Sequence, residues 1–284
     1  MLARAPQGKR EREFEFTPAD FEAVRKTLYE LAGISLNDGK SDLVYGRLAR
    51  RLRRLRMRCF SEYLGYIHSA PGKGEVVHFI NALTTNLTAF FREPHHFEFL
   101  TNTALPETML RHRNDHRVRL WSAGCSTGEE PYSIAMILSE SPLLSSPWDT
   151  RLLATDLDSN VVATAREGRY AEQRISGLTR VRSKKWFHPL PGGKEVQVKS
   201  ALQDAITFKQ LNLMHDWPMR GSFDIIFCRN VVIYFDKPTQ KQLFERYADI
   251  LVDGGYLFLG HSETMHKLSD RFELVGKTIY RKVK

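Results

Sequence analysis

The sequence predicts a small all-helical domain over residues 1–80, followed by an α/β domain built on a mostly parallel, doubly wound sheet. In the first part, apolar residues recur at helical spacing. From Val118 onward, short apolar runs alternate with helical patterns, which is typical of parallel sheets with helices on both faces. The interval 168–205 breaks this alternation and contains the strand-like Val196-Gln197-Val198, so it predicts a small inserted antiparallel β subdomain.

The composition limits the class of protein. The 284 residues carry a formal net charge of +9, which favours an acidic partner such as nucleic acid, an anionic membrane or an acidic protein surface. Cys59, Cys125 and Cys228 lie far apart, which argues against a disulfide framework or a structural zinc site. We expect residues 1–15 to be a disordered leader without an apolar signal core. No apolar run approaches the ~20 residues of a membrane span, so we expect a cytoplasmic protein, with a monomer as the default.

The first helix is predicted to begin at Thr17 as N-cap, with Pro18 at the first helical position and Gly33 after its end. A second helix is predicted over residues 41–58. Its apolar stripe comprises Val44, Leu48, Leu52, Leu55 and Cys59. Two more helices are expected over 61–68 and 75–83.

The second helix is unusually basic. Seven arginines stand in it against one acid, Asp42, and an adjoining face carries Arg47, Arg50, Arg51, Arg54 and Arg58. A solvated helix face usually mixes charges of both signs. A run of one sign therefore favours an acidic partner over a solvated face, and arginine matches carboxylates and phosphates in a bidentate manner.

The α/β part is read from its apolar runs. Strands are predicted over 118–123, 151–155, 206–209, 223–228 and 256–259, and helices over 131–139, 160–166 and 238–251. The last runs, 272–275 and 278–280, predict an edge hairpin or an end strand.

Gly124 and Gly128 bracket a small-residue turn between the first strand and its helix, as in folds that bind nucleotides. The turn lacks the G-x-G-x-x-G spacing and the P-loop lysine, so a tight turn without a ligand remains an alternative.

Polar residues follow the other predicted strands. Asp156 ends the second strand, where an acid can accept hydrogen bonds from ribose hydroxyls, while Asp158 or Ser159 would cap the next helix. Asn212 and Asn230 follow the third and fourth strands. Because ligands of open α/β sheets bind outside the carboxyl ends of the strands, these residues predict one crevice, although each asparagine could be a turn former.

Three stretches together resemble the CheR family of chemoreceptor glutamate methyltransferases. They read NALTTNLTAFFRE over 81–93, STGEEPYS over 126–133 and FCRNVVIYF over 227–235. The resemblance implies a transferase that uses S-adenosyl-L-methionine, yields S-adenosyl-L-homocysteine, and methylates receptor glutamates in chemotaxis. It also implies a Rossmann-like class I methyltransferase domain over 101–284 and a linker over 81–100 that contributes to the cofactor site.

The resemblance also implies the site residues. Cofactor contacts are expected from the linker, the glycine turn and the strand ends: Asn86, Thr88, Arg92, Gly124, Glu130, Asp156, Asn212, Leu213, Asn230 and Val231. Arg92 and Tyr234 are expected to orient the accepting carboxylate. The alternatives are a pair with Glu93 or a surface charge for Arg92, and a core position for Tyr234. Arg47, Arg50, Arg51 and Arg54 would contact the acidic helical bundle of a chemoreceptor. Whether segment 168–205 docks a receptor peptide stays open.

Other chemistries are less well supported. No metal site is expected, because the adjacent His95 and His96 cannot both point at one ion from a helix face. His261-Ser262-Glu263 does not establish a catalytic triad. A nucleic-acid methyltransferase is the alternative enzyme, but residues 230–234 lack the prolines of a loop that holds a flipped base, so no nucleic acid is expected. A regulator that binds cofactor without transfer is the other alternative.

Overall fold

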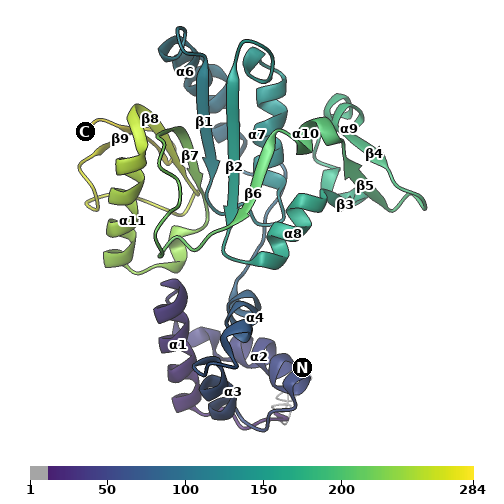
Figure 1. Cartoon of the computed structure of the whole chain (residues 1–284), viewed down its shortest axis with the longest axis vertical. Coiled ribbons are helices and arrows are strands. Elements are labelled where there is room, and N and C mark those ends of the chain that lie inside the picture. Colours follow the sequence, from purple (N-terminus) through teal and green to yellow (C-terminus); the bar gives the residue numbers. More distant parts are fainter. Residues whose placement is uncertain (1–11) are drawn as a thin grey trace, which may run out of the picture. The chain divides into compact units, whose positions relative to one another are not determined.

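The computed structural model of the chain describes residues 12–284. Contacts between Cα atoms divide it into two units, which are described separately (Figure 1). The first contains the chain up to Leu31 together with Ser35–Leu83, and the second contains Ala32–Ile34 and Thr84–Lys284. Among the described residues, no helix combines the length and the apolar composition that crossing a membrane requires.

The first unit is helical. Its elements are α1 (Pro18–Ala32), the 3-10 turn η1 (Asp38–Lys40), α2 (Ser41–Leu55), α3 (Phe60–Ile67) and α4 (Lys73–Leu83). The predicted start of α1 is confirmed: Thr17 Oγ1 accepts from the Asp20 N–H at 3.1 Å, and the Asp20 carboxylate accepts from the Thr17 N–H at 2.8 Å. This reciprocal cap satisfies backbone donors that the first helical turn leaves open.

The second helix ends earlier than predicted. Arg56 adopts a left-handed conformation with φ of 57°, and its N–H donates to the Arg53 carbonyl, which closes α2 at Leu55. Val44, Leu48 and Leu52 are buried as expected, whereas Leu55 and Cys59 are partly exposed because the helical stripe stops.

The predicted leader lies mostly outside the described residues. Its last part packs on the helical unit: the Phe14 ring contacts Phe60, with centroids 6.5 Å apart, and Arg12 pairs with Asp42 at 2.5 Å. Residues 12–15 therefore differ from the expected disorder, because an aromatic ring and a charged group in this short stretch both find partners.

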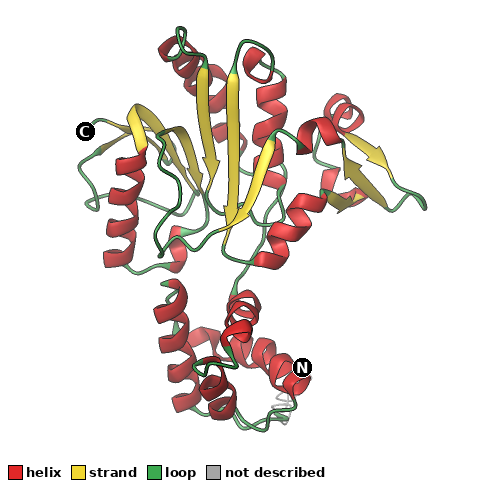
Figure 2. Ribbon diagram, viewed as in Figure 1, coloured by secondary structure: helices red, strands yellow, loops and turns green. Residues whose placement is uncertain are grey.

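The second unit contains a seven-stranded sheet in the order β6-β2-β1-β7-β8-β10-β9 (Figures 1 and 2). Strands β6, β2, β1, β7 and β8 are parallel, and the pairs β8–β10 and β10–β9 are antiparallel. The strands are β1 (Arg117–Ser122), β2 (Asp149–Asp156), β6 (Ile206–Gln210), β7 (Phe223–Cys228), β8 (Leu251–Leu259), β9 (Phe272–Gly276) and β10 (Ile279–Lys282). The predicted α/β class and the terminal hairpin are confirmed.

Helices flank this sheet on both faces (Figure 2). They are α5 (Pro94–Phe99), which continues through the π-helical turn η2 (Leu100–Ala104) into α6 (Leu105–Arg111), and then α7 (Glu129–Ser139), α8 (Ser159–Glu167) and α11 (Lys237–Ile250). The short 3-10 turns η3 (Pro142–Leu144) and η5 (Val232–Tyr234) follow α7 and β7. Strand β7 is buried along its whole length, as expected for a central parallel strand.

The predicted β subdomain is confirmed as an antiparallel three-stranded sheet in the order β3-β5-β4. It comprises β3 (Arg169–Ala171), η4 (Glu172–Ile175), α9 (Arg180–Trp186), β4 (Phe187–Pro189) and β5 (Glu195–Val198), with α10 (Ser200–Gln203) leading back to β6. Phe187 and Val196 join its inner face to the main hydrophobic core, so the insertion is packed on the sheet domain.

Candidate functional site

The carboxyl ends of β2, β1 and β7 lie at one edge of the sheet, because these strands are parallel. The glycine turn follows β1, Asp156 ends β2, and Asn230 follows β7. The structure therefore brings together residues that the sequence predicted to share one crevice.

Side chains from other elements pack directly against the backbone of the glycine turn. A Cβ atom on Gly124 would lie 2.3 Å from Cγ2 of Val231, so only glycine fits there without displacement of the neighbouring loop. Gly128 has φ of 101°, and a Cβ on it would meet the Tyr170 hydroxyl at 2.8 Å. Helix α7 begins directly after Gly128, two residues earlier than predicted.

Asp156 fixes the turn from β2. Its carboxylate accepts the Ser126 N–H at 2.8 Å and the Asp158 N–H at 3.0 Å. Burial raises the pKa of Asp156 to about 6, although these two hydrogen bonds oppose the shift. Asp158 caps α8 through the Asn160 N–H at 2.9 Å, which confirms the predicted capping role of Asp158.

Glu130 is committed to partners inside the protein. Its carboxylate accepts from Ser122 Oγ at 2.8 Å and from Arg229 Nη1 at 3.0 Å. Burial raises the pKa of Glu130, and the Arg229 charge opposes that effect. Arg229 also pairs with Glu93 at 3.2 Å, and its Nη2 donates to the Arg92 carbonyl.

Arg229 was missed by sequence reasoning. It was visible only as a charged residue at the end of an apolar strand, within the stretch 227–235. Its guanidinium is nearly buried and joins the end of β7 to α7 and to the linker. A buried charge is retained where it is paired and hydrogen-bonded, which is the case here.

The linker before α5 is tied to the same edge. Asn86 Nδ2 donates to the Asp158 carboxylate at 2.8 Å, and the Asn86 carbonyl accepts from Ser126 Oγ at 2.9 Å. Arg92 does not pair with Glu93; its Nη1 donates to the Leu87 carbonyl at 2.8 Å. These bonds hold residues 86–92 against the glycine turn and the end of β2.

The residues after β6 and β7 form tight turns. Asn212 Oδ1 accepts the Met214 N–H at 2.9 Å, which is the turn-forming role that the sequence left open. Asn230 is left-handed, with φ of 58°, and its N–H donates to Glu263 at 2.8 Å. Tyr234 is partly exposed rather than a core aromatic, and its hydroxyl lies 3.5 Å from the Thr85 carbonyl.

Two further residues at this edge were not predicted. The buried Glu263 carboxylate accepts N–H groups from Gly260, Asn230 and Ile233, so it shapes the loop after β7 rather than serving a triad. Arg174 reaches from the β subdomain to the Thr88 carbonyl at 3.0 Å and pairs with the buried Glu129. Apart from the Glu263–Gly260 bond, these contacts join residues distant in the chain, which local sequence patterns do not reveal.

In the helical unit, the arginines of α2 differ in environment. Arg50 and Arg54 are exposed and Arg47 is partly exposed, as a docking surface requires. Arg51 differs from the expected receptor-contacting arginine, because it forms a bidentate pair with the buried Glu75, at 2.6 and 2.8 Å. Tyr63 donates to the same carboxylate at 2.9 Å, so Arg51 is part of the core of this unit.

Contrary to the prediction, His95 and His96 can both face one ion. Glu93, His95 and His96 each offer a ligand atom, and these atoms lie within 4.8 Å of one another. Burial, followed by the Arg229 charge, lowers the pKa of His96 to about 4. The histidines lie at the start of α5, where Glu93 is left-handed and turns its side chain toward them, so adjacency in sequence does not separate them.

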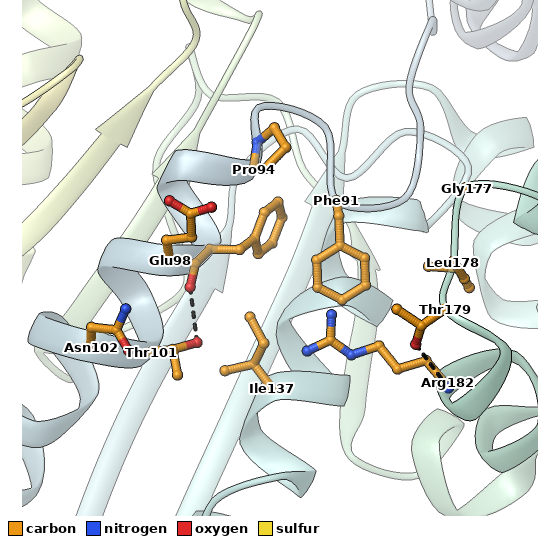
Figure 3. Close-up of a pocket in the computed structure, with 11 residues that line it drawn as sticks. Phe91, Pro94, Glu98, Thr101, Asn102, Ile137, Gly177, Leu178, Thr179 and Arg182 are labelled. Carbon is orange, nitrogen blue, oxygen red and sulfur yellow. Dashed lines mark hydrogen bonds between the residues drawn. The ribbon is translucent and has the colours of Figure 1, made fainter.

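A separate hollow of about 330 Å³ lies beside α7 (Figure 3). Phe91, Phe97, Ile137 and Leu178 contribute its apolar surface, and the Arg182 guanidinium lies 4.4 Å from the centre of the Phe91 ring. None of the residues predicted to bind cofactor lines this hollow.

Comparison with known proteins identifies the class. Residues 86–281 match the family model "CheR methyltransferase, SAM binding domain", and residues 19–84 match "CheR methyltransferase, all-alpha domain". The sheet domain is therefore a Rossmann-like, S-adenosylmethionine-dependent methyltransferase domain.

Curated relatives agree over nearly the whole chain. "Chemotaxis protein methyltransferase 2" of Pseudomonas aeruginosa is 45% identical, with 94% of each chain covered. "Probable chemotaxis protein methyltransferase" of Rhizobium etli is 44% identical, covering 89% of this chain and 96% of the relative. The Escherichia coli "Chemotaxis protein methyltransferase" is 43% identical, covering 92% and 90%. The chain belongs to the CheR methyltransferase family, which confirms the resemblance seen in the sequence.

Proposed function

We propose that this enzyme transfers the methyl group of S-adenosyl-L-methionine to glutamate carboxylates of chemoreceptors, giving methyl esters and S-adenosyl-L-homocysteine. The observation that carries the proposal is the convergence of the linker, the glycine turn and the end of β2 through Asn86, Ser126 and Asp158. The names of the relatives place their activity in chemotaxis, and the domain match supports the cofactor.

The residues at the sheet edge suit this cofactor. Because residue 124 is a glycine, Val231 can pack directly against the turn, which brings the loop after β7 next to the turn after β1. Each carboxylate oxygen of Asp156 accepts one backbone N–H and keeps a second lone pair for a ribose hydroxyl. Asn212 and Leu213 would flank the adenine, and Asn230 and Val231 would lie beside it. Thr88 would contribute from the linker.

Glu130 would act through its neighbours. Both of its oxygens already accept hydrogen bonds, from Ser122 and Arg229. We assign it the role of fixing Arg229, whose second nitrogen holds the carbonyl of Arg92. The position of Arg92 at the site thus depends on a buried carboxylate on another element.

The reaction demands little proton transfer. When bound, S-adenosylmethionine supplies a methyl group activated by the sulfonium. A glutamate side chain is ionised at neutral pH, so its oxygen attacks without a general base. The protein must exclude water and aim the carboxylate. Arg92 and Tyr234 are the groups for this task, because both donate to linker carbonyls, of Leu87 and Thr85, and so lie over the same segment.

Receptor recognition is assigned to α2. Arg47, Arg50 and Arg54 present positive charge over successive turns, and arginine pairs with carboxylates on an acidic helical bundle. Arg51 is removed from this set, because Glu75 holds it. We expect no membrane insertion and a monomeric enzyme.

The test is a transfer assay with the full chain, methyl-labelled S-adenosylmethionine and a chemoreceptor signalling fragment. The expected result is label on the receptor that base releases as methanol. Tyr234→Phe is expected to lower kcat while the cofactor Kd stays within about twofold, since it removes one donor to the carboxylate.

The other outcomes contradict the proposal. Stable label on nucleic acid, with binding that weakens steeply as salt rises, would indicate a nucleic-acid methyltransferase. Cofactor binding without transfer to any receptor fragment would indicate a regulator.

A further inference from the structure

The start of α5 carries a side-chain cluster that the proposed reaction does not use. Glu93 Oε2 and His96 Nδ1 lie 3.4 Å apart, and His95 lies next to them, with its ring centre 4.2 Å from that of His96. His96 is fully buried, and the Glu93 side chain is 13% exposed. Two ring nitrogens in the cluster, His95 Nε2 and His96 Nδ1, are buried without a hydrogen-bond partner, and Glu93 Oε2 faces Arg229 Nη2 at 3.2 Å.

The hydrogen bonds of His96 fix its tautomer. Its Nε2 lies 3.0 Å from the Lys277 carbonyl, which can only accept, so Nε2 carries the proton. In the neutral ring, Nδ1 then presents a lone pair, and it faces the Glu93 carboxylate oxygen, which also only accepts. Arg229 Nη2 offsets the carboxylate charge from one side, at 3.2 Å, but the Nδ1 lone pair of His96 has no hydrogen-bond donor, so a cation placed between Nδ1 and the carboxylate would bind both acceptors.

The carboxylates around this cluster outnumber the cation that contacts them. Glu93 and Glu130 contribute two carboxylates, and Arg229 is the cation that contacts both of them. Arg229 already serves Glu130 and the Arg92 carbonyl. A cation bound at Glu93 would offset the negative charge of that carboxylate. Arg229 would keep its contacts with Glu130 and with the Arg92 carbonyl.

We propose that Glu93, His95 and His96 form a binding site for a divalent transition metal of the zinc type. Imidazole nitrogens and a carboxylate oxygen are the ligands that such ions take, and one ligand atom from each residue lies within 4.8 Å of the other two. The Nε2–H bond from His96 to a backbone carbonyl is the outer contact that metal-bound histidines use to hold their orientation. Water completes the coordination.

The site adjoins the proposed cofactor residues without including them. It follows Arg92 by one residue, so an ion there would fix the end of the linker. The inference does not depend on the identity of the methyl acceptor, since it concerns binding of an ion to the free protein.

The test is a titration of the metal-free full chain with Zn²⁺, in competition with a chelating dye. One equivalent is expected to bind, and His95→Ala is expected to weaken binding by at least about tenfold. His95 is the ligand to change first, because it is partly exposed whereas His96 lies in the core. His188→Ala is the matched control, since His188 is exposed on β4, and it is expected to bind as the natural chain does.

Two further measurements distinguish the site from scattered surface binding. Co²⁺ is expected to give visible d–d absorption that His95→Ala and Glu93→Gln each reduce. Zn²⁺ is expected to raise the melting temperature of the natural chain and of His188→Ala, but not of His95→Ala. The proposal is overturned if His95→Ala binds Zn²⁺ as tightly as the natural chain, or if no saturable binding occurs.

Discussion

Val231 fills the space that a side chain on residue 124 would need: a Cβ on Gly124 would lie 2.3 Å from Val231 Cγ2. The turn after β1 and the loop after β7 are therefore shaped against each other. The backbone at the proposed cofactor edge owes its position to this contact as much as to its own sequence.

Gly124→Ala is expected to destabilise the protein by about 1–3 kcal/mol, because the new methyl group overpacks the turn. Cofactor affinity should fall with it. Adding Val231→Ala should restore much of the stability, since Val231 Cβ lies at an ordinary 3.8 Å from the added atom. Thermal unfolding and calorimetric titration with S-adenosylmethionine measure the two effects. A double variant no more stable than Gly124→Ala would contradict this explanation.

Reversal of Arg50 and Arg54 to Glu is expected to raise the KM for receptor by about tenfold or more, because association loses its charge complementarity. The cofactor Kd should not change. The matched control is Arg113→Glu with Arg220→Glu, which reverses two exposed arginines outside α2 and alters net charge equally. An equal loss in both double variants would argue against a docking role for α2.

Arg51→Met is expected to cost about 3–5 kcal/mol of unfolding free energy, because it leaves the buried Glu75 carboxylate without its cation. Glu75 would retain the Tyr63 hydroxyl as a donor. Chemical denaturation measures the loss, and Arg54→Met serves as the exposed control from the same helix. A loss as small as that of the control would show that the Glu75 pair contributes little.

Cofactor affinity is expected to fall as the pH drops below about 6, because burial raises the pKa of Asp156 to about 6 and a protonated carboxyl loses acceptor capacity. The decrease should approach tenfold per pH unit for one required ionisation. The folded-state pKa of Asp156 lies above its unfolded value, so its contribution to the free energy of unfolding is present at low pH and is lost as the pH rises through 6. Protonation of Asp156 therefore does not unfold the free protein in acid. Calorimetry from pH 5 to 8 measures the affinity, and a flat profile would exclude the role of Asp156.

Arg174→Met is expected to lower stability by about 1–3 kcal/mol and to weaken cofactor binding, because Glu129 is buried and loses a charged partner. Thr127 would remain its hydrogen-bond donor, at 2.6 Å. Arg180→Met, at an exposed arginine of the same subdomain, is the control. Unchanged cofactor affinity in Arg174→Met would show that the bridge does not position the turn.

Local features of the site could be predicted from sequence. The glycine turn, the acid that ends β2 and the cap of α8 each depend on a few neighbouring residues with strong conformational preferences. The end of α2 could not be predicted, because Arg56 adopts a left-handed conformation that arginine rarely favours.

The charge network could not be predicted because its partners are distant in sequence. Arg229 and Glu130 lie 99 positions apart, and Arg51 and Glu75 lie 24 apart. Sequence alone shows Arg51 as one arginine among seven, and only folding separates it from its exposed neighbours. The same holds for His95 and His96, whose convergence with Glu93 depends on the backbone before α5.

The β subdomain contacts the glycine turn through a hydrogen bond: the Tyr170 hydroxyl donates to the Thr127 carbonyl at 2.7 Å. This hydrogen bond joins the insertion to the turn that we propose to hold the cofactor. A molecule that binds the subdomain and displaces Tyr170 would change cofactor affinity, and the cofactor would change that molecule's affinity by the same factor.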